Sequence, residues 1–157
     1  CYGCPRIDAI PNSLGNLRVL SCSNCPNLAL IPDTLGNLQW LECSNCPSLF
    51  SLPITLIILQ RLECSNCRNL AAIPPTLVRL RELVCSNCPA LILIQLRNLR
   101  ELNCSNCPFL KSITNDPGKL QRLWCRNCRD LTSIPIVGKD FLIDHTGCPA
   151  LMPIPTV

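Results

Sequence analysis

The sequence predicts a solenoid in which short strands from successive coils stack into one parallel β-sheet. The first observation is a pair of cysteines with two residues between them, which occurs seven times in 157 residues. The second is a set of leucines that keeps the same register around every pair. A period of this length is the signature of a repeat architecture. We therefore expect a single array of about seven coils of roughly 21 residues over 1–157. The pairs are Cys1/Cys4, Cys22/Cys25, Cys43/Cys46, Cys64/Cys67, Cys85/Cys88, Cys104/Cys107 and Cys125/Cys128, followed by Cys148.

Each coil should contain one short strand, because apolar residues alternate at steps such as Leu20-x-Cys22 and Leu41-x-Cys43. Asparagine then tolerates a left-handed backbone within the turn between the two cysteines. It recurs as Asn24, Asn45, Asn66, Asn87, Asn106 and Asn127. An Ile-Pro or Leu-Pro step follows in most coils and disfavours helix before the proline. We expect an extended or 3-10 return side with little α-helix.

Three departures from the period predict local changes. The coil between Cys88 and Leu99 is two residues short and carries Gln95 in place of proline, so its outer wall should tighten. The segment 114–118, Thr-Asn-Asp-Pro-Gly, should form a turn. In the last coil Phe141 and Ile143 fill leucine positions and His145 fills a cysteine position, which predicts a terminal cap in which the single histidine has a packed or a capping role.

The unit reads L-x-x-L-x-C-S-N-C-P-x-L-x-x-I-P, as in LQWLECSNCPSLFSLP over 38–53. It resembles the leucine-rich-repeat family over essentially the whole chain, with cysteine at the third apolar position and at the usual asparagine position. Cysteine-bearing units of this kind are similar to repeats in plant immune receptors and bacterial repeat proteins. The C-S-N-C-P form is similar to repeat proteins encoded by giant viruses of amoebae. The resemblance implies a leucine-rich-repeat solenoid of the α/β horseshoe type, here mostly β.

The repeated cysteines allow three interpretations. They can form two ladders of small buried thiols that act as compact hydrophobic groups. They can form disulfides between coils, because a spacing of about 4.8 Å suits a disulfide. They can hold zinc or an iron–sulfur cluster, although metal modules use isolated four-ligand sets. We favour free thiols over disulfides, and expect neither a metal nor a cofactor. The core ladders are Cys22, Cys25, Cys43, Cys46, Cys64, Cys67, Cys85, Cys88, Cys104, Cys107, Cys125 and Cys128.

Side chains between the core positions should face solvent in columns. One column runs from Val19 to Arg122, the next from Ser21 to Trp124, and a third is serine until Arg126. Exposed tryptophan and arginine are favoured at binding hot spots. The candidate partner-binding residues are Trp40, Arg61, Glu82, Glu101, Arg122, Trp124 and Arg126.

A purely structural interpretation of the same residues stays open. Arg61 would then stack on Trp40, while Arg61–Glu82 and Glu101–Arg122 would be cross-strand ion pairs. Glu42 and Glu63 have no cation in their own column.

Composition excludes several function classes. A net charge of +4 is too small for a dedicated nucleic-acid binder, so Arg18, Arg81 and Arg100 should form a solvated stripe. No apolar stretch is long enough for a membrane span, so we expect no membrane insertion. With one histidine and no phosphate loop, we expect no enzyme.

The sequence therefore favours a scaffold that binds another protein. Assembly of the chain into a larger complex is compatible with this role. A structural component such as a virion protein is the alternative, and a metal-loaded repeat a weaker one. The visible chain shows no signal peptide, and an intracellular or virion-associated location is favoured. Because it starts at Cys1 within a repeat, we expect a piece of a longer protein.

Overall fold

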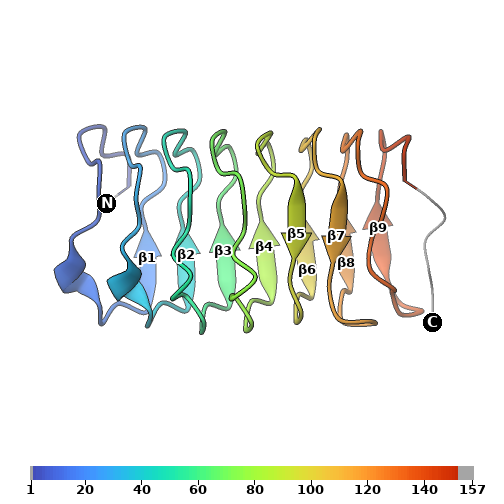
Figure 1. The fold of residues 1–157 in the computed structure, drawn as a ribbon, viewed down its shortest axis with the longest axis horizontal. Coiled ribbons are helices and arrows are strands. Elements are labelled where there is room, and N and C mark those ends of the chain that lie inside the picture. Colours follow the sequence, from blue (N-terminus) through green and yellow to red (C-terminus); the bar gives the residue numbers. More distant parts are fainter. Residues whose placement is uncertain (1, 152–157) are drawn as a thin grey trace.

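A computed structural model describes residues 2–151 as a parallel β-solenoid whose coils stack in sequence order along one axis (Figure 1). Seven three-residue strands form one parallel sheet, in the order β1-β2-β3-β4-β6-β8-β9. The prediction of one short strand per coil is confirmed. The strands are β1 (Val19–Ser21), β2 (Trp40–Glu42), β3 (Arg61–Glu63), β4 (Glu82–Val84), β6 (Glu101–Asn103), β8 (Arg122–Trp124) and β9 (Leu142–Asp144).

Helix is confined to two single 3-10 turns, η1 (Asn12–Leu14) and η2 (Asp33–Leu35), over the range 2–151. Each begins after a proline in extended geometry, Pro11 at φ −62° and ψ 137° and Pro32 at φ −74° and ψ 150°. The return side is therefore extended or 3-10, as the Ile-Pro steps predict. No helix in this part of the chain is long and apolar enough to cross a bilayer.

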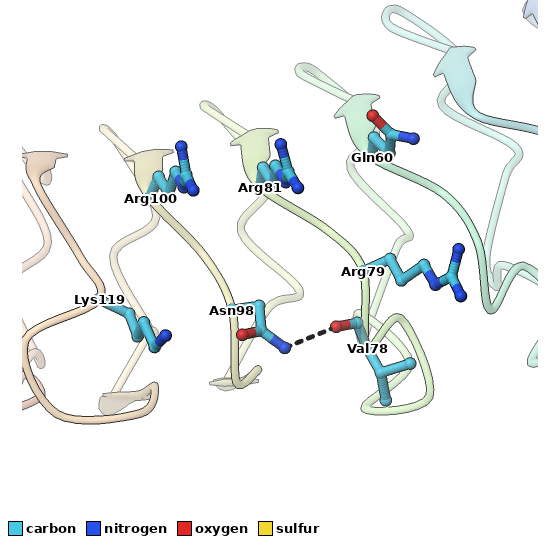
Figure 2. Close-up of a pocket in the computed structure, with 7 residues that line it drawn as sticks. All are labelled: Gln60, Val78, Arg79, Arg81, Asn98, Arg100 and Lys119. Atoms are coloured by element: carbon cyan, nitrogen blue, oxygen red, sulfur yellow. Dashed lines mark hydrogen bonds between the residues drawn. The ribbon is translucent and has the colours of Figure 1, made fainter.

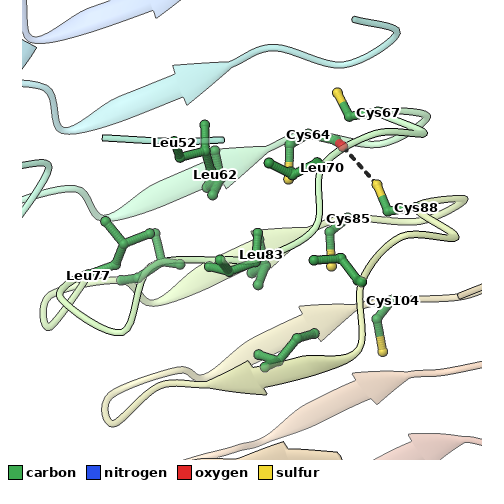
Figure 3. Close-up of a cluster of buried hydrophobic side chains, with 14 of the residues drawn as sticks. Leu52, Leu62, Cys64, Cys67, Leu70, Leu77, Leu83, Cys85, Cys88 and Cys104 are labelled. Atoms are coloured by element: carbon green, nitrogen blue, oxygen red, sulfur yellow. Dashed lines mark hydrogen bonds between the residues drawn. The ribbon is translucent and has the colours of Figure 1, made fainter. Parts of the chain in front are cut away.

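The interior is one continuous cluster of leucine, isoleucine and cysteine (Figure 3). The middle residue of each strand points inward, and Leu41, Leu62 and Leu102 are fully buried. Cysteines of successive coils lie beside these leucines, as Cys64, Cys85 and Cys104 do. Because a single coil cannot bury its own apolar face, the fold depends on stacking between neighbours.

The turn between the two cysteines uses the left-handed backbone in every coil. The six asparagines of this slot, 24, 45, 66, 87, 106 and 127, have φ between 57° and 60°. Gly3 and Gly147 hold the same slot in the first and last coils, at φ 66° and 77°. The slot thus takes only residues that tolerate positive φ.

A second sheet on the return wall corrects the expectation of a single sheet. It pairs β5 (Leu93–Gln95) with β7 (Ser112–Thr114) in parallel. These strands belong to the two neighbouring coils that lack the proline step. Elsewhere on this wall, within residues 2–151, the pairing is limited to single bridges, Ala9 with Leu30 and Ser112 with Ser133. Ala9, Leu30 and Ser133 each lie two residues before a proline. Proline has no N–H to donate, so the ladder lengthens only where proline is missing.

The structure confirms only part of what was predicted for the segment 114–118 and for the last coil. The predicted turn lies at 117–119, where Gly118 has φ 69°, whereas Thr114 belongs to β7. Phe141 and Ile143 are partly buried against the core. His145 is exposed, so of the packed and capping roles expected for it the packed one is wrong. The final coil covers the core with Phe141, Ile143 and the buried Cys148.

Candidate functional site

The exposed face of the seven-stranded sheet, called the sheet face below, consists of rows that run across the coils. The first row pairs Val19, Trp40, Arg61, Glu82, Glu101, Arg122 and Leu142 in successive register. The second row pairs Ser21, Glu42, Glu63, Val84, Asn103, Trp124 and Asp144. The two predicted columns are therefore true spatial neighbours, and each extends to β9.

Arg61 connects most of the candidate residues in the N-terminal half of the sheet face. Its guanidinium lies 5.1 Å from the ring centroid of Trp40 and 3.1 Å from the Glu82 carboxylate. It also reaches Glu63 at 2.7 Å, and this hydrogen bond raises the pKa of Arg61. The cation–π contact and the first cross-strand ion pair are thus both present. Together Trp40, Arg61 and Glu82 line a shallow depression of about 340 Å³ with Val19.

Glu63 is a partner that the column pattern did not identify. Its row holds no cation beside it, but Arg61 lies two residues earlier on the same strand and so points to the same face. The alternation along one strand, added to the pairing across strands, is the signal that would have found this contact.

The C-terminal half of the sheet face has a different arrangement around Trp124. Arg122 binds Glu101 at 2.6 Å, and Arg126 binds Asp144 at 2.5 Å. Trp124 is 38% exposed, and these two ion-paired arginines lie two residues before and two residues after it in the chain. The hydrogen bond from Arg126 also lowers the pKa of the Asp144 carboxyl.

Sequence reasoning left Asp144 out of the candidate set. It pairs with Trp124 as the last member of the second row. Extending that column by one coil finds it, because Ile143 and Cys148 align with Leu123 and Cys128 at the same step of 20 residues.

The serine column is part of the frame and not a free surface. The Ser23 hydroxyl accepts a hydrogen bond from the backbone N–H of Ser44 at 3.1 Å, and Ser44 accepts one from Ser65 in the same way. A third such bond joins Ser86 to Ser65. Ser23 is 7% exposed and the following serines are half-buried. These hydroxyls extend the sheet's ladder beyond the strand ends, which corrects their assignment as solvent-facing.

The cysteines form two ladders inside the solenoid. All fourteen within residues 2–151 are free thiols. From Cys46 to Cys148, the second cysteine of the coil donates its thiol hydrogen to the carbonyl of the first cysteine one coil earlier, as Cys88 does to Cys64 at 3.2 Å (Figure 3). The cross-linked alternative therefore gains no support from this arrangement.

Burial holds several of the thiols in the protonated form, whereas side-chain hydrogen bonds with Cys43 and Cys104 lower the pKa of Cys67 and Cys128. Burial raises the pKa of Cys22, Cys88 and Cys107 to about 12 and that of Cys46 to about 11. A protonated thiol is a poor nucleophile and a poor metal ligand. Within the described range, no three His, Cys, Asp or Glu side chains are grouped so that they could hold a metal ion.

Comparison with known proteins agrees with the fold. The family model described as Leucine Rich Repeat matches residues 16–38 and 98–120, and these matches support a place in the leucine-rich-repeat family. The two segments contain β1 and β6 respectively. No curated protein matches the chain.

Proposed function

We propose that this chain is a non-enzymatic scaffold that binds a partner protein through its sheet face, with Trp124, Arg122 and Arg126 at the centre of the contact. Leucine-rich-repeat solenoids are typical protein-interaction scaffolds. The partner would also meet Trp40, Arg61, Glu82 and Glu101 along the first row. The observation that carries the proposal is Trp124, a large exposed aromatic between two arginines that carboxylates already hold in place.

The contrast between frame and face supports this proposal. Inward positions and the serine column repeat with little change, whereas the first row holds valine, tryptophan, arginine and glutamate in turn. A fixed frame with a varied face is the arrangement expected where side chains serve recognition.

Trp124 is a better hot-spot candidate than Trp40. The ring of Trp40 already has the Arg61 guanidinium over it, and no such cation lies over Trp124 within residues 2–151. A partner can therefore cover the indole of Trp124 without displacing an internal contact. Arg122 and Arg126 lose little conformational entropy on binding, because their ion pairs already order them.

The test is retention of partner proteins on immobilised chain, followed by affinity measurement with each purified partner. Trp124→Ala and Arg126→Ala should each weaken binding, and Trp124→Ala by about 30-fold or more. The matched control is Phe109→Ala, which removes a 58% exposed aromatic that lies outside the sheet face.

Equal affinity for the wild type and Trp124→Ala would overturn the proposed hot spot. If only Phe109→Ala lost binding, the partner would contact a surface outside the sheet face. Self-assembly of the chain with no foreign partner would favour the structural-component alternative.

A further inference from the structure

A groove with four cations lies at the edge of the sheet, where the return side leads into the strands (Figure 2). It has a volume of about 330 Å³ and spans four coils, from Gln60 to Lys119. Arg81, Arg100 and Gln60 project side by side from the strand ends, and Arg79, Asn98 and Lys119 lie on the segments that lead to the strands. These six residues are called the basic groove below.

The cations of the basic groove lack carboxylate partners. Each ion pair of the described chain involves Arg61, Arg122 or Arg126, and none involves a groove cation. The carboxylates next in sequence, Glu82 and Glu101, are bound by Arg61 and Arg122 on the sheet face. The groove therefore keeps an uncompensated charge although the whole chain carries only +4.

The backbone forces two of these arginines together. The backbone N–H of Arg100 donates to the Arg81 carbonyl at 2.8 Å, so the two residues occupy equivalent positions in neighbouring coils. Coils in a sheet are about 4.8 Å apart, and like charges directly opposite each other are unfavourable. A bound anion between them would remove this repulsion and accept hydrogen bonds from both guanidinium groups.

We propose that the basic groove binds an acidic peptide segment whose carboxylates are shared by Arg81, Arg100, Arg79 and Lys119. Three coil steps cover about 14 Å, which an extended chain spans with about four residues. The side-chain amides of Gln60 and Asn98 lie in the same groove. Asn98 donates to the Val78 carbonyl at 2.8 Å, so its amide oxygen faces away from that bond and can accept from a peptide N–H.

The lining favours a carboxylate-rich peptide over a nucleic-acid strand. Binding of single-stranded nucleic acid combines basic residues with aromatic side chains on which bases stack. None of the groove-lining residues is aromatic. This site goes beyond the sheet-face function and does not depend on it, since Trp124 and Arg126 lie outside the groove.

The test is fluorescence anisotropy at about 50 mM salt with labelled (Glu-Ser)₄, and with (Gln-Ser)₄ as the neutral probe. The wild type should bind the glutamate peptide and not the glutamine peptide. Its affinity should fall as salt rises. The variant Arg81→Gln with Arg100→Gln should lose at least about tenfold in affinity. This variant should fold, because glutamine already occupies the slot as Gln39, Gln60 and Gln121.

The matched control is Arg18→Gln, which removes the same charge from the same slot outside the groove. It should bind within about twofold of wild type, as should Trp124→Ala. Equal binding by the Arg81/Arg100 variant and Arg18→Gln would overturn the proposal. Tighter binding of an octathymidine strand than of (Glu-Ser)₄ would also overturn it, in favour of a nucleic-acid ligand.

Discussion

The thiol of Cys67 donates a hydrogen bond to the backbone carbonyl of Cys43 in the preceding coil, with an Sγ···O distance of 3.0 Å. The same bond joins every step of the ladder from Cys46 to Cys148. The second cysteine of each of these pairs lies in the interior of the solenoid. Its sulfur fills the core as a small apolar group and also satisfies a buried carbonyl.

Replacing Cys67 with alanine should destabilise the solenoid more than replacing Cys64. Both changes remove one fully buried sulfur, but only Cys67 donates to a carbonyl of another coil. The unpaired Cys43 carbonyl should cost about 1 kcal/mol more in the free energy of unfolding. Urea unfolding followed by circular dichroism measures the difference. Equal losses would show that the thiol hydrogen bond contributes nothing.

Alkaline pH should unfold the protein in a reducing buffer. The folded pKa of Cys22, Cys88 and Cys107 is about 12, against an ordinary value of 9.0. Above pH 9 the unfolded chain releases these protons and the folded chain keeps them. Each of these three thiols should therefore lower the free energy of unfolding by about 1.4 kcal/mol per pH unit between pH 9 and its folded pKa.

Thermal melts from pH 8 to 11, with a reductant that remains active at high pH, check this expectation. The melting temperature should be steady up to pH 9 and then drop steeply. A melting temperature that stays constant to pH 11 would contradict burial of the thiols in the folded state.

Asn66 should tolerate glycine but not alanine. Its φ of 60° is unfavourable for a residue with a Cβ, while asparagine and glycine adopt it readily. Asn66→Ala should cost about 1–2 kcal/mol of unfolding free energy, and Asn66→Gly should stay within about 0.5 kcal/mol. Gly3 and Gly147 already occupy this slot. If alanine proved as stable as glycine, the left-handed turn would not be the reason for asparagine.

Asn115 should protect the backbone of the shortened coil. Its side chain accepts from the Leu99 N–H at 3.0 Å and donates to the Leu99 carbonyl at 2.8 Å. Asn115→Ala should cost about 1–3 kcal/mol and speed hydrogen exchange at the Leu99 amide. Asn115→Asp keeps the acceptor and should leave that amide protected. Unchanged exchange in the alanine variant would rule out this role.

Much of the fold could be predicted because the sequence repeats with a nearly constant period of about 21 residues. One strand per coil follows from alternation around Leu41 and Cys43, and left-handed turns follow from asparagine in one slot. The rows of the sheet face follow from the same register, since residues 21 apart become neighbours when coils stack. The second sheet does not follow from this reasoning: the missing proline after Ile94 predicts a tighter wall and the residues after Ile113 predict a turn, whereas both positions regain a backbone hydrogen-bond donor.

The sequence by itself determined the solenoid, the inward cysteines and the order of side chains along each row. With a fixed period, only one register of neighbouring coils places the apolar positions on top of one another. Only the tertiary structure decided which groups meet. Arg61 contacts Trp40, Glu63 and Glu82 together, and Arg126 reaches Asp144, through side-chain directions that spacing does not specify. The basic groove arises in the same way, because Arg79 and Lys119 come from segments 40 residues apart and share one surface only when the coils stack.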